Sequence, residues 1–196
     1  MIIICFAIFI LYGFLILQLY VGFNQIPMFE SKNQKPTTQF SIIVPFRNEA
    51  RNLKNLIACL DKLNYLHVDF EVILVDDASD KLYALEENTI DIQIIKNIRK
   101  SNSPKKDAIE TAIQVAKFPW IVTTDADCLV GENWLTILDQ FIQIQKAEMV
   151  VGAVKYESDR SFLHQFQSLD MASLQGVTIG SFGISKRFMC NGANYP

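Results

Sequence analysis

The amino-acid sequence predicts an α/β fold, in which a mostly parallel sheet is flanked by helices and preceded by one transmembrane helix. Three observations lead to this class. From residue 40 onward, short apolar runs rich in β-branched residues alternate with segments that are apolar at helical spacing. Several of these runs are continuously apolar, which is typical of parallel strands covered on both faces. Residues 2–23 are apolar almost without interruption.

The N-terminal apolar segment, Ile2 to Phe23, is long enough to cross a membrane. At a rise of about 1.5 Å per residue, roughly 20 helical residues span a hydrocarbon core of about 30 Å. A cleaved signal peptide would need a basic start and a small-residue cleavage site, and the segment has neither. A buried core helix would show one polar face, whereas Gln18 is the one strongly polar residue here. The segment is therefore predicted to be a membrane anchor.

The charges that flank this segment predict its orientation. No basic residue precedes it, whereas Lys32, Lys35, Arg47 and Arg51 follow it. The positive-inside rule then places the C-terminal side in the cytosol. Residues 24–39 lack any apolar periodicity and contain prolines and amides, so they are predicted to be a linker.

The rest of the chain alternates between the two kinds of element. The predicted strands are Phe40 to Pro45, Phe70 to Val75, Ile90 to Ile95, Trp120 to Thr124 and Glu148 to Val154. The predicted helices are Glu49 to Leu63 with Asn48 as N-cap, Lys105 to Lys117 and Gly131 to Lys146, with a weaker helix after Ser79 and a further one around Phe162 to Leu169. Ligands of parallel sheets bind beyond the carboxyl ends of the strands, so functional residues are expected there.

Composition argues against several classes of function. The formal net charge is -3, from 18 basic and 21 acidic residues, and no basic stripe points to a nucleic-acid partner. The four cysteines form no CxxC pair, which favours reduced thiols over a disulfide framework. The two histidines are far apart, so a histidine-based zinc site is not expected.

Asp125 and Asp127 follow directly on a predicted strand. Carboxylates at this spacing can both reach a hard cation if the backbone turns, and Mg²⁺ is typically held by one or two carboxylates together with substrate phosphates. The alternative is an Asx turn that caps the next helix. The pair alone does not decide between these interpretations.

Two further groups lie at predicted strand ends or loops. Asp76 and Asp77 are adjacent, and their carboxylates would repel each other unless a base N–H donates a hydrogen bond to them or a cation such as Arg47 lies beside them. The alternative interpretation of the pair is that it caps a helix. Lys105 and Lys106 open a predicted helix, where positive charge opposes the helix macrodipole unless an anion such as a diphosphate binds. The alternative is that both lysines are simply solvated.

Taken together and in order, three segments resemble the family 2 glycosyltransferases. They are Ser41 to Glu49 (SIIVPFRNE), Val75 to Ser79 (VDDAS) and Thr124 to Asp127 (TDAD). The resemblance covers residues 40–196 and implies the GT-A fold, a Rossmann-like nucleotide-binding half joined to an acceptor-binding half. Membrane-anchored polysaccharide synthases are among the relatives it suggests.

The resemblance implies roles in nucleotide binding. Val44 and Pro45 would line the base pocket through their backbone. Arg47 and Glu49 occupy positions where the family contacts the nucleotide. Asp76 matches the carboxylate that accepts a hydrogen bond from uracil.

It also implies residues for the diphosphate, the metal and the sugar. Asp125 matches the residue near the ribose and diphosphate, and Asp127 the principal ligand of Mg²⁺ or Mn²⁺, so both belong to the implied metal site. Lys105 falls where many members carry a Gly-Lys pair, with Pro104 in place of the glycine. The loop bordering the donor sugar and acceptor would be formed by Asn191, Gly192, Ala193 and Asn194.

The implied activity is transfer of a hexosyl or N-acetylhexosaminyl group from a UDP-sugar to a glycan or lipid-linked acceptor, with inversion and with Mg²⁺ or Mn²⁺ as cofactor. The family's catalytic base belongs to a later acidic motif, so it is expected beyond Pro196, and residues 40–196 are expected to be a domain truncated at its acceptor side. A nucleotidyltransferase or dinucleotide-dependent oxidoreductase would show a glycine-rich loop after the first strand, which is absent here. A catalytically inactive, membrane-anchored nucleotide-binding or scaffold protein remains an alternative.

Overall fold

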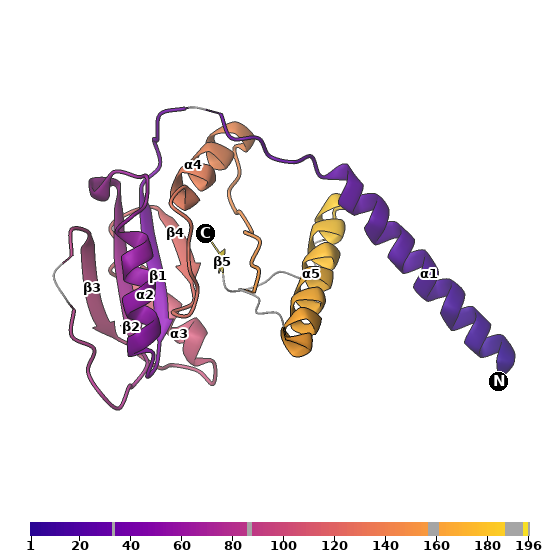
Figure 1. Cartoon of the computed structure of the whole chain (residues 1–196), viewed down its shortest axis with the longest axis horizontal. Helices are drawn as coiled ribbons and strands as arrows, with labels where there is room; N and C mark the ends of the chain where they lie inside the picture. The colour runs from indigo at the N-terminus through magenta and orange to yellow at the C-terminus, as the bar shows by residue number, and fades with distance from the viewer. Residues whose placement is uncertain (33, 86–87, 157–160, 187–193, 196) are drawn as a thin grey trace. The chain divides into compact units, whose positions relative to one another are not determined.

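The computed structural model describes residues 1–32, 34–85, 88–156, 161–186 and 194–195 (Figure 1). The chain divides into two compact units, each described here by itself. The first unit comprises Met1–Glu30 and Ala153–Asn191. The second comprises Ser31–Gly152 and Gly192–Pro196.

The first unit contains two long helices, α1 (Ile2–Gln25) and α5 (Phe162–Gly183). Within the described residues, α1 is the one helix whose length and apolar composition would suffice to cross a membrane, with a mean hydropathy of 2.8. Most of its large apolar side chains are exposed, and α1 ends two residues beyond the predicted Phe23. The further helix expected around Phe162 is present and continues to Gly183.

Glycines allow the backbones of α1 and α5 to approach closely. A Cβ atom added to Gly22 would lie 2.1 Å from the carbonyl oxygen of Gly180, and one added to Gly183 would lie 1.9 Å from that of Gly22. Both distances are shorter than any real contact, so these positions admit glycine alone without movement of the backbone. Small residues at a crossing are typical of helices that pack within a membrane.

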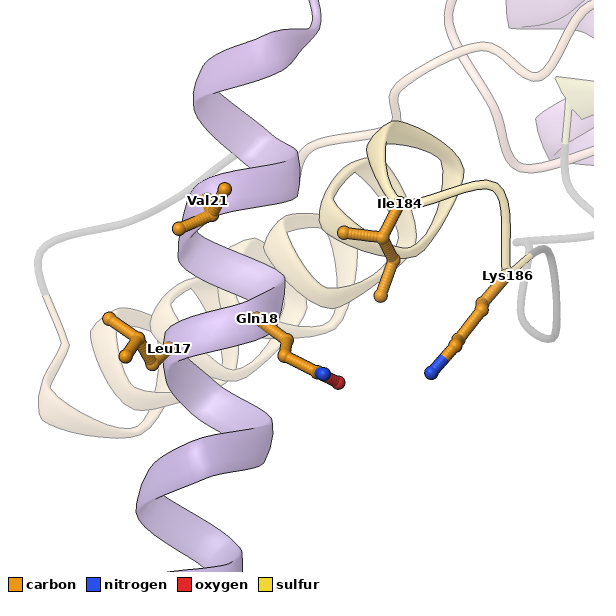
Figure 2. Close-up of a pocket in the computed structure, with 5 residues that line it drawn as sticks. All are labelled: Leu17, Gln18, Val21, Ile184 and Lys186. Atoms are coloured by element: carbon orange, nitrogen blue, oxygen red, sulfur yellow. The ribbon is translucent and has the colours of Figure 1, made fainter.

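An open groove of about 260 Å³ lies beside this crossing, as Figure 2 shows. Its lining residues are Leu17, Gln18, Val21, Ile184 and Lys186. The lining is mainly apolar and contains no carboxylate, so this groove does not hold the acidic residues predicted to bind a ligand.

The second unit is built on a single sheet. Its strands are β1 (Phe40–Phe46), β2 (Phe70–Asp76), β3 (Asp91–Lys96), β4 (Trp120–Thr124) and β5 (Asn194–Tyr195). The helices around it are α2 (Ala50–Leu60), α3 (Pro104–Ile113) and α4 (Trp134–Gln145), with a short 3₁₀ turn at His67–Asp69. The strand order is β3-β2-β1-β4-β5, the first four strands being parallel and β5 antiparallel to β4. The predicted parallel sheet flanked by helices is confirmed.

Two of the predicted elements are wrong. Residues 148–154 form neither strand nor helix, and the described strand beside β4 is β5 instead. The described residues between Ser79 and β3 contain no helix. In addition, α3 stops at Ile113 instead of Lys117, since the Lys117 amide leaves the helix and donates to the Glu71 carboxylate.

The core lies on both faces of the sheet, as the continuous apolar runs predicted. Successive strand residues point to opposite faces. The cluster on the face of α2 and α4 includes Phe40, Ile42, Val44, Phe70, Val72, Leu74, Val122, Leu53, Leu56, Leu60, Leu135 and Leu138. The cluster on the other face joins Ile43, Ile73 and Val75 to Ala108 and Ala112 of α3. Burial on both faces holds the strand ends in fixed register.

At the amino end of the sheet, a buried carboxylate connects neighbouring strands. Glu71, which is 1% exposed, accepts hydrogen bonds from the Ser41 hydroxyl at 2.6 Å and the Lys117 amide at 2.5 Å. The Ser41 hydroxyl in turn accepts a hydrogen bond from the Phe118 amide at 3.1 Å. The ammonium of Lys117 lies 3.6 Å from Glu71 and 2.5 Å from Asp91. One side chain thus connects β1, β2 and the segment that enters β4.

The second half of the predicted linker is bound to α4 by hydrogen bonds. The fully buried Asp139 accepts hydrogen bonds from the Thr38 amide at 3.0 Å and the Thr37 amide at 3.3 Å. The Tyr65 hydroxyl donates to the Thr38 carbonyl at 2.6 Å, and burial raises the pKa of this phenol. The Ser31 hydroxyl donates to Gln140 of α4 at 2.7 Å. The chain therefore enters β1 in a fixed position.

Candidate functional site

The strand order indicates the point of the sheet at which a ligand would bind. The chain runs outward from β1 to β2 and β3, then returns to place β4 on the other side of β1. In parallel sheets, ligands bind at the carboxyl ends of the strands where the order reverses. The turns after β1 and β4 flank this point, and the turn after β2 is next to it.

The turns after β1 and β2 are locked together. Asn48 and Ala78 adopt left-handed backbone conformations, with φ of 59° and 61°. The Asn48 amide donates to the Ser79 hydroxyl at 2.9 Å, and the Asn48 side chain exchanges two hydrogen bonds with Asp80. Asn48 is therefore not the N-cap of α2, which is Glu49. A left-handed Ala costs about 1–2 kcal/mol, and such strain is concentrated at functional sites.

The two adjacent aspartates at the end of β2 have different partners. Asp77 accepts two hydrogen bonds from Arg99, at 2.8 and 2.7 Å, and one from the Asn97 side chain at 2.6 Å. The hydrogen bond from Arg99 is the main reason that the pKa of Asp77 lies below its usual value. Asp76, which is 8% exposed, accepts a hydrogen bond from the Ser79 amide at 2.9 Å. No helix in the described chain begins here, so helix capping does not explain the pair.

The loop between β3 and α3 is held by a third aspartate, Asp107, in the first turn of α3. Its carboxylate, 2% exposed, accepts hydrogen bonds from the amides of Lys100 and Ser101 and from the Ser101 hydroxyl, each at 2.8 Å. These bonds, the Ser101 amide first, lower the pKa of Asp107. The loop that carries Arg99 is thereby fixed against α3.

The end of β4 meets the beginning of α3 through an ion pair. The Lys105 ammonium lies 2.6 Å from Oδ1 of Asp125, and both side chains are partly exposed. Lys106 turns away and lies 3.6 Å from Glu110, one turn along α3. Asp127 is exposed two residues beyond Asp125. Helix α4 begins only at Trp134, with Asn133 as N-cap, so neither aspartate caps it.

The residue types at this strand end are those that hold a divalent ion when a ligand completes its coordination. Within the described residues, no group of three His, Cys, Asp or Glu side chains is close enough to hold an ion by itself. Two carboxylates at one strand end match instead the way proteins hold Mg²⁺, which keeps several waters and is completed by substrate phosphates. Mn²⁺ accepts the same oxygen ligands. Asp125 and Asp127 are the residues that would hold such an ion.

The remaining predicted residues lie around the same strand ends. Val44 is fully buried, Pro45 is half-buried, and Arg47 is exposed in the turn after β1. Glu49 accepts a hydrogen bond from the Asn52 side chain at 2.6 Å. The predicted loop residues 191–193 lie outside the described residues. Asn194 begins β5 and pairs with Thr124, the residue before Asp125.

Sequence reasoning did not identify Asn97, Arg99 or Asp107. The sequence did contain a signal for Asn97 and Arg99, because they follow the carboxyl end of β3, where functional residues of a parallel sheet are expected. Asp107 gave a weaker signal, since an aspartate in the first turn of a helix is common for its effect on the helix dipole alone.

The fold is that of a doubly wound α/β protein, a class that commonly binds nucleotides. Acidic and basic side chains lie near the point where the strand order reverses. The model of the family described as "Glycosyl transferase family 2" matches residues 41–188, which is well over half of the chain. The protein therefore belongs to glycosyl transferase family 2, and the family resemblance carried by its three motifs is confirmed.

Comparison with individual proteins agrees with this assignment. The chain is 25% identical over 121 residues to poly(ribitol-phosphate) beta-N-acetylglucosaminyltransferase TarS of Staphylococcus aureus strain Mu50, covering 60% of this chain and 21% of TarS. The same identity and coverage are found for TarS of strain MW2. The chain thus spans about a fifth of the curated relatives that it matches.

Solved structures confirm the GT-A type of fold. The structure of S. aureus TarS 1–349 superposes with a TM-score of 0.52 and 21% identity, over 63% of this chain and 37% of that one. The mannosyltransferase PcManGT from Pyrobaculum calidifontis, solved with GDP-Man and Mn²⁺, gives a TM-score of 0.57 and 19% identity, over 74% and 44% of the two chains. At these identities the likeness shows the fold.

Proposed function

We propose that this chain forms the donor-binding part of a glycosyltransferase that takes a sugar from a UDP-sugar in the presence of Mg²⁺ or Mn²⁺. The observation that carries the proposal is the presence of Asp76, Lys105, Asp125 and Asp127 at the carboxyl edge of the sheet, around the point where the strand order reverses. Carboxylates and a lysine are the groups that recognition of a base, a diphosphate and an ion requires.

Each component of the ligand has a matching group. Asp76 offers a carboxylate acceptor to a base N–H, and Val44 and Pro45 offer backbone at the end of β1. Lys105, at the beginning of α3, offers positive charge and a helix N-terminus to a diphosphate. Asp125 and Asp127 would hold the ion, which supplies positive charge to the diphosphate when it is bound.

The choice of donor rests on the relatives. TarS is named as an N-acetylglucosaminyltransferase and has been solved in complex with UDP-GlcNAc, whereas PcManGT has been solved with GDP-Man and Mn²⁺. The sequence match to TarS favours a UDP-linked hexose or N-acetylhexosamine. We further propose transfer with inversion to a glycan or lipid-linked acceptor, on the family resemblance.

We also propose that residues 1–23 anchor the protein in a membrane, that residues 24–39 link the anchor to the glycosyltransferase domain, and that this domain is cytosolic. The support is the length and apolar character of α1 and the basic residues that follow it. A cytosolic domain has access to nucleotide sugars, which are made in that compartment.

Calorimetric titration of UDP into the full chain in detergent micelles, with and without Mn²⁺, tests the donor site. We expect saturable binding that depends on Mn²⁺ and is stronger for UDP than for GDP. Asp127→Asn should weaken the Mn²⁺-dependent binding by at least about tenfold, since even outer-shell residues of metal sites contribute this much. Asp91→Asn, at the opposite end of the sheet, is the matched control and should bind as the unchanged protein does.

Two results would count against the proposal. Absence of UDP binding by a folded protein would contradict the donor site. Equal binding of UDP with and without Mn²⁺, unaltered in Asp127→Asn, would contradict the metal assignment while leaving nucleotide binding intact.

A further inference from the structure

Of the two adjacent lysines that open α3, only one reaches the end of β4. The Lys105 ammonium lies 2.6 Å from Asp125, whereas the Lys106 ammonium lies 3.6 Å from Glu110 within the same helix. Lys105 therefore places a positive charge on the carboxylate that is expected to face an ion and a diphosphate. The Asp125 side chain is 35% exposed, so the pair is accessible from solvent.

The location of Lys105 makes this pair easy to break. Positive charge in the first turn of a helix opposes the macrodipole, and Asp125 offsets that effect in the absence of a ligand. Partly exposed ion pairs contribute little to stability, so a competing partner can replace either side. The lysine side chain has a flexible stem, which lets its ammonium move several ångströms without movement of the backbone.

A divalent ion on Asp125 and the Lys105 ammonium would repel each other at contact distance. An ion can therefore bind Asp125 fully only when the ammonium withdraws. A diphosphate at the beginning of α3 gives the ammonium a stronger anionic partner there, since the phosphate oxygens attract both the helix N-terminus and the lysine.

We infer that Lys105 is a positioning residue that exchanges partners: it holds Asp125 while the donor site is free of ligand, and it moves to the diphosphate when ion and nucleotide bind together. This inference rests on the proposed function. It makes binding of the ion conditional on the nucleotide, because the ion alone must compete with Lys105 whereas the ion with a diphosphate releases it.

Titration of the full chain in detergent micelles with Mn²⁺ alone tests the exchange, with free Mn²⁺ followed by electron paramagnetic resonance. Lys105→Met should bind Mn²⁺ about two- to fivefold more tightly than the unchanged protein, the effect expected of a partly exposed ion pair. Lys106→Met is the matched control and should leave Mn²⁺ affinity unchanged, as should Lys105→Arg, which keeps the charge. With Mn²⁺ saturating, Lys105→Met should bind UDP several-fold more weakly.

Opposite effects of one substitution on Mn²⁺ and on UDP distinguish exchange from a merely structural role, which would weaken both. Circular dichroism establishes folding, and Lys105→Gln provides a second uncharged variant. If the unchanged protein binds UDP with Mn²⁺ but Lys105→Met and Lys105→Gln bind Mn²⁺ alone no more tightly than Lys106→Met, the exchange is overturned and the proposed function stands. If the unchanged, folded protein does not bind UDP with Mn²⁺, the proposed function itself is overturned.

Discussion

The two ends of the parallel sheet differ in the partners of their carboxylates. At the amino end, Glu71 and Asp139 are buried and accept hydrogen bonds from main-chain amides of neighbouring segments. At the carboxyl end, Asp107 is held in the same way, but Asp77 and Asp125 are paired with Arg99 and Lys105, whose long side chains are about half exposed. Ion pairs with exposed cations are thus the feature that sets the carboxyl end apart.

The difference has a physical cause. A main-chain amide cannot leave its carboxylate unless the backbone moves, so removal of the carboxylate leaves a buried donor without a partner. A solvent-exposed ammonium or guanidinium can move to another anion at little cost. Stability is therefore expected to depend on the amino end, and ligand binding on the carboxyl end.

The largest effect on stability is expected from Glu71→Ala. This change would leave the Ser41 hydroxyl and the Lys117 amide without their acceptor, at a cost of about 2–6 kcal/mol in the free energy of unfolding, since each buried donor left unpaired costs about 1–3 kcal/mol. Urea denaturation followed by circular dichroism measures it. Asp91→Ala removes the exposed partner of the same lysine and should change stability by less than about 0.5 kcal/mol. Equal effects of the two changes would remove the distinction between buried and exposed carboxylates.

A smaller effect is expected from Asp139→Ala. The buried Thr38 amide would lose its acceptor, at a cost of about 1–3 kcal/mol. Hydrogen exchange of residues 34–39 should accelerate, because the linker would be released from α4. The control is Asp69→Ala, which removes one exposed hydrogen bond to Gln39 and should leave that exchange unaltered. Slow exchange retained in Asp139→Ala would show that other contacts hold the linker.

The smallest effect is expected from Arg99→Met, and it should depend on pH. Because Arg99 lowers the pKa of Asp77 in the folded protein, the Asp77 carboxylate contributes stability above its ordinary pKa of 3.8. That contribution is lost as the pH falls through the lower folded value. The variant should therefore be slightly less stable than the unchanged protein at pH 7 and equal to it in strong acid.

Denaturation at a series of pH values checks this prediction, with Lys100→Met as the control. Lys100 is the adjacent exposed cation, whose contact with Asp107 is made by its amide and not by its side chain. A stability difference for Arg99→Met that persists unchanged into strong acid would show that the pair with Asp77 is not its source.

Local sequence was sufficient to predict an element when its own residues, without their neighbours in space, carry a clear strand or helix pattern. The run from Phe40 to Val44 is apolar at every position but Ser41 and ends in three β-branched residues, so it indicates a strand whatever lies beside it. The prediction for Glu148 to Val154 used the same signal and was wrong, because strand formation also depends on pairing with a neighbouring strand, which a local pattern does not contain.

Sequence motifs located Asp76, Asp125 and Asp127 at strand ends, and the structure places them there. Their partners could not be predicted. Arg99 pairs with Asp77 across 22 positions and Lys105 with Asp125 across 20, and each pair joins the end of one strand to a loop or helix that follows another. A sequence scan ranks such distant basic residues equally, so Arg47 at the end of another strand was named as a partner of Asp77 and Arg99 was not.

The sequence by itself determined that this protein has an apolar N-terminal helix, an α/β domain and acidic motifs at strand ends, because each depends on hydrophobic period and residue type within a short window. Tertiary structure alone decided the strand order, and with it which charges meet. Parallel strands are joined by long crossover connections, so the order of strands along the chain does not determine which strands are neighbours in the sheet. In this chain, the placement of β4 beside β1 brings Asp125 to Lys105 and makes the two ends of the sheet chemically different.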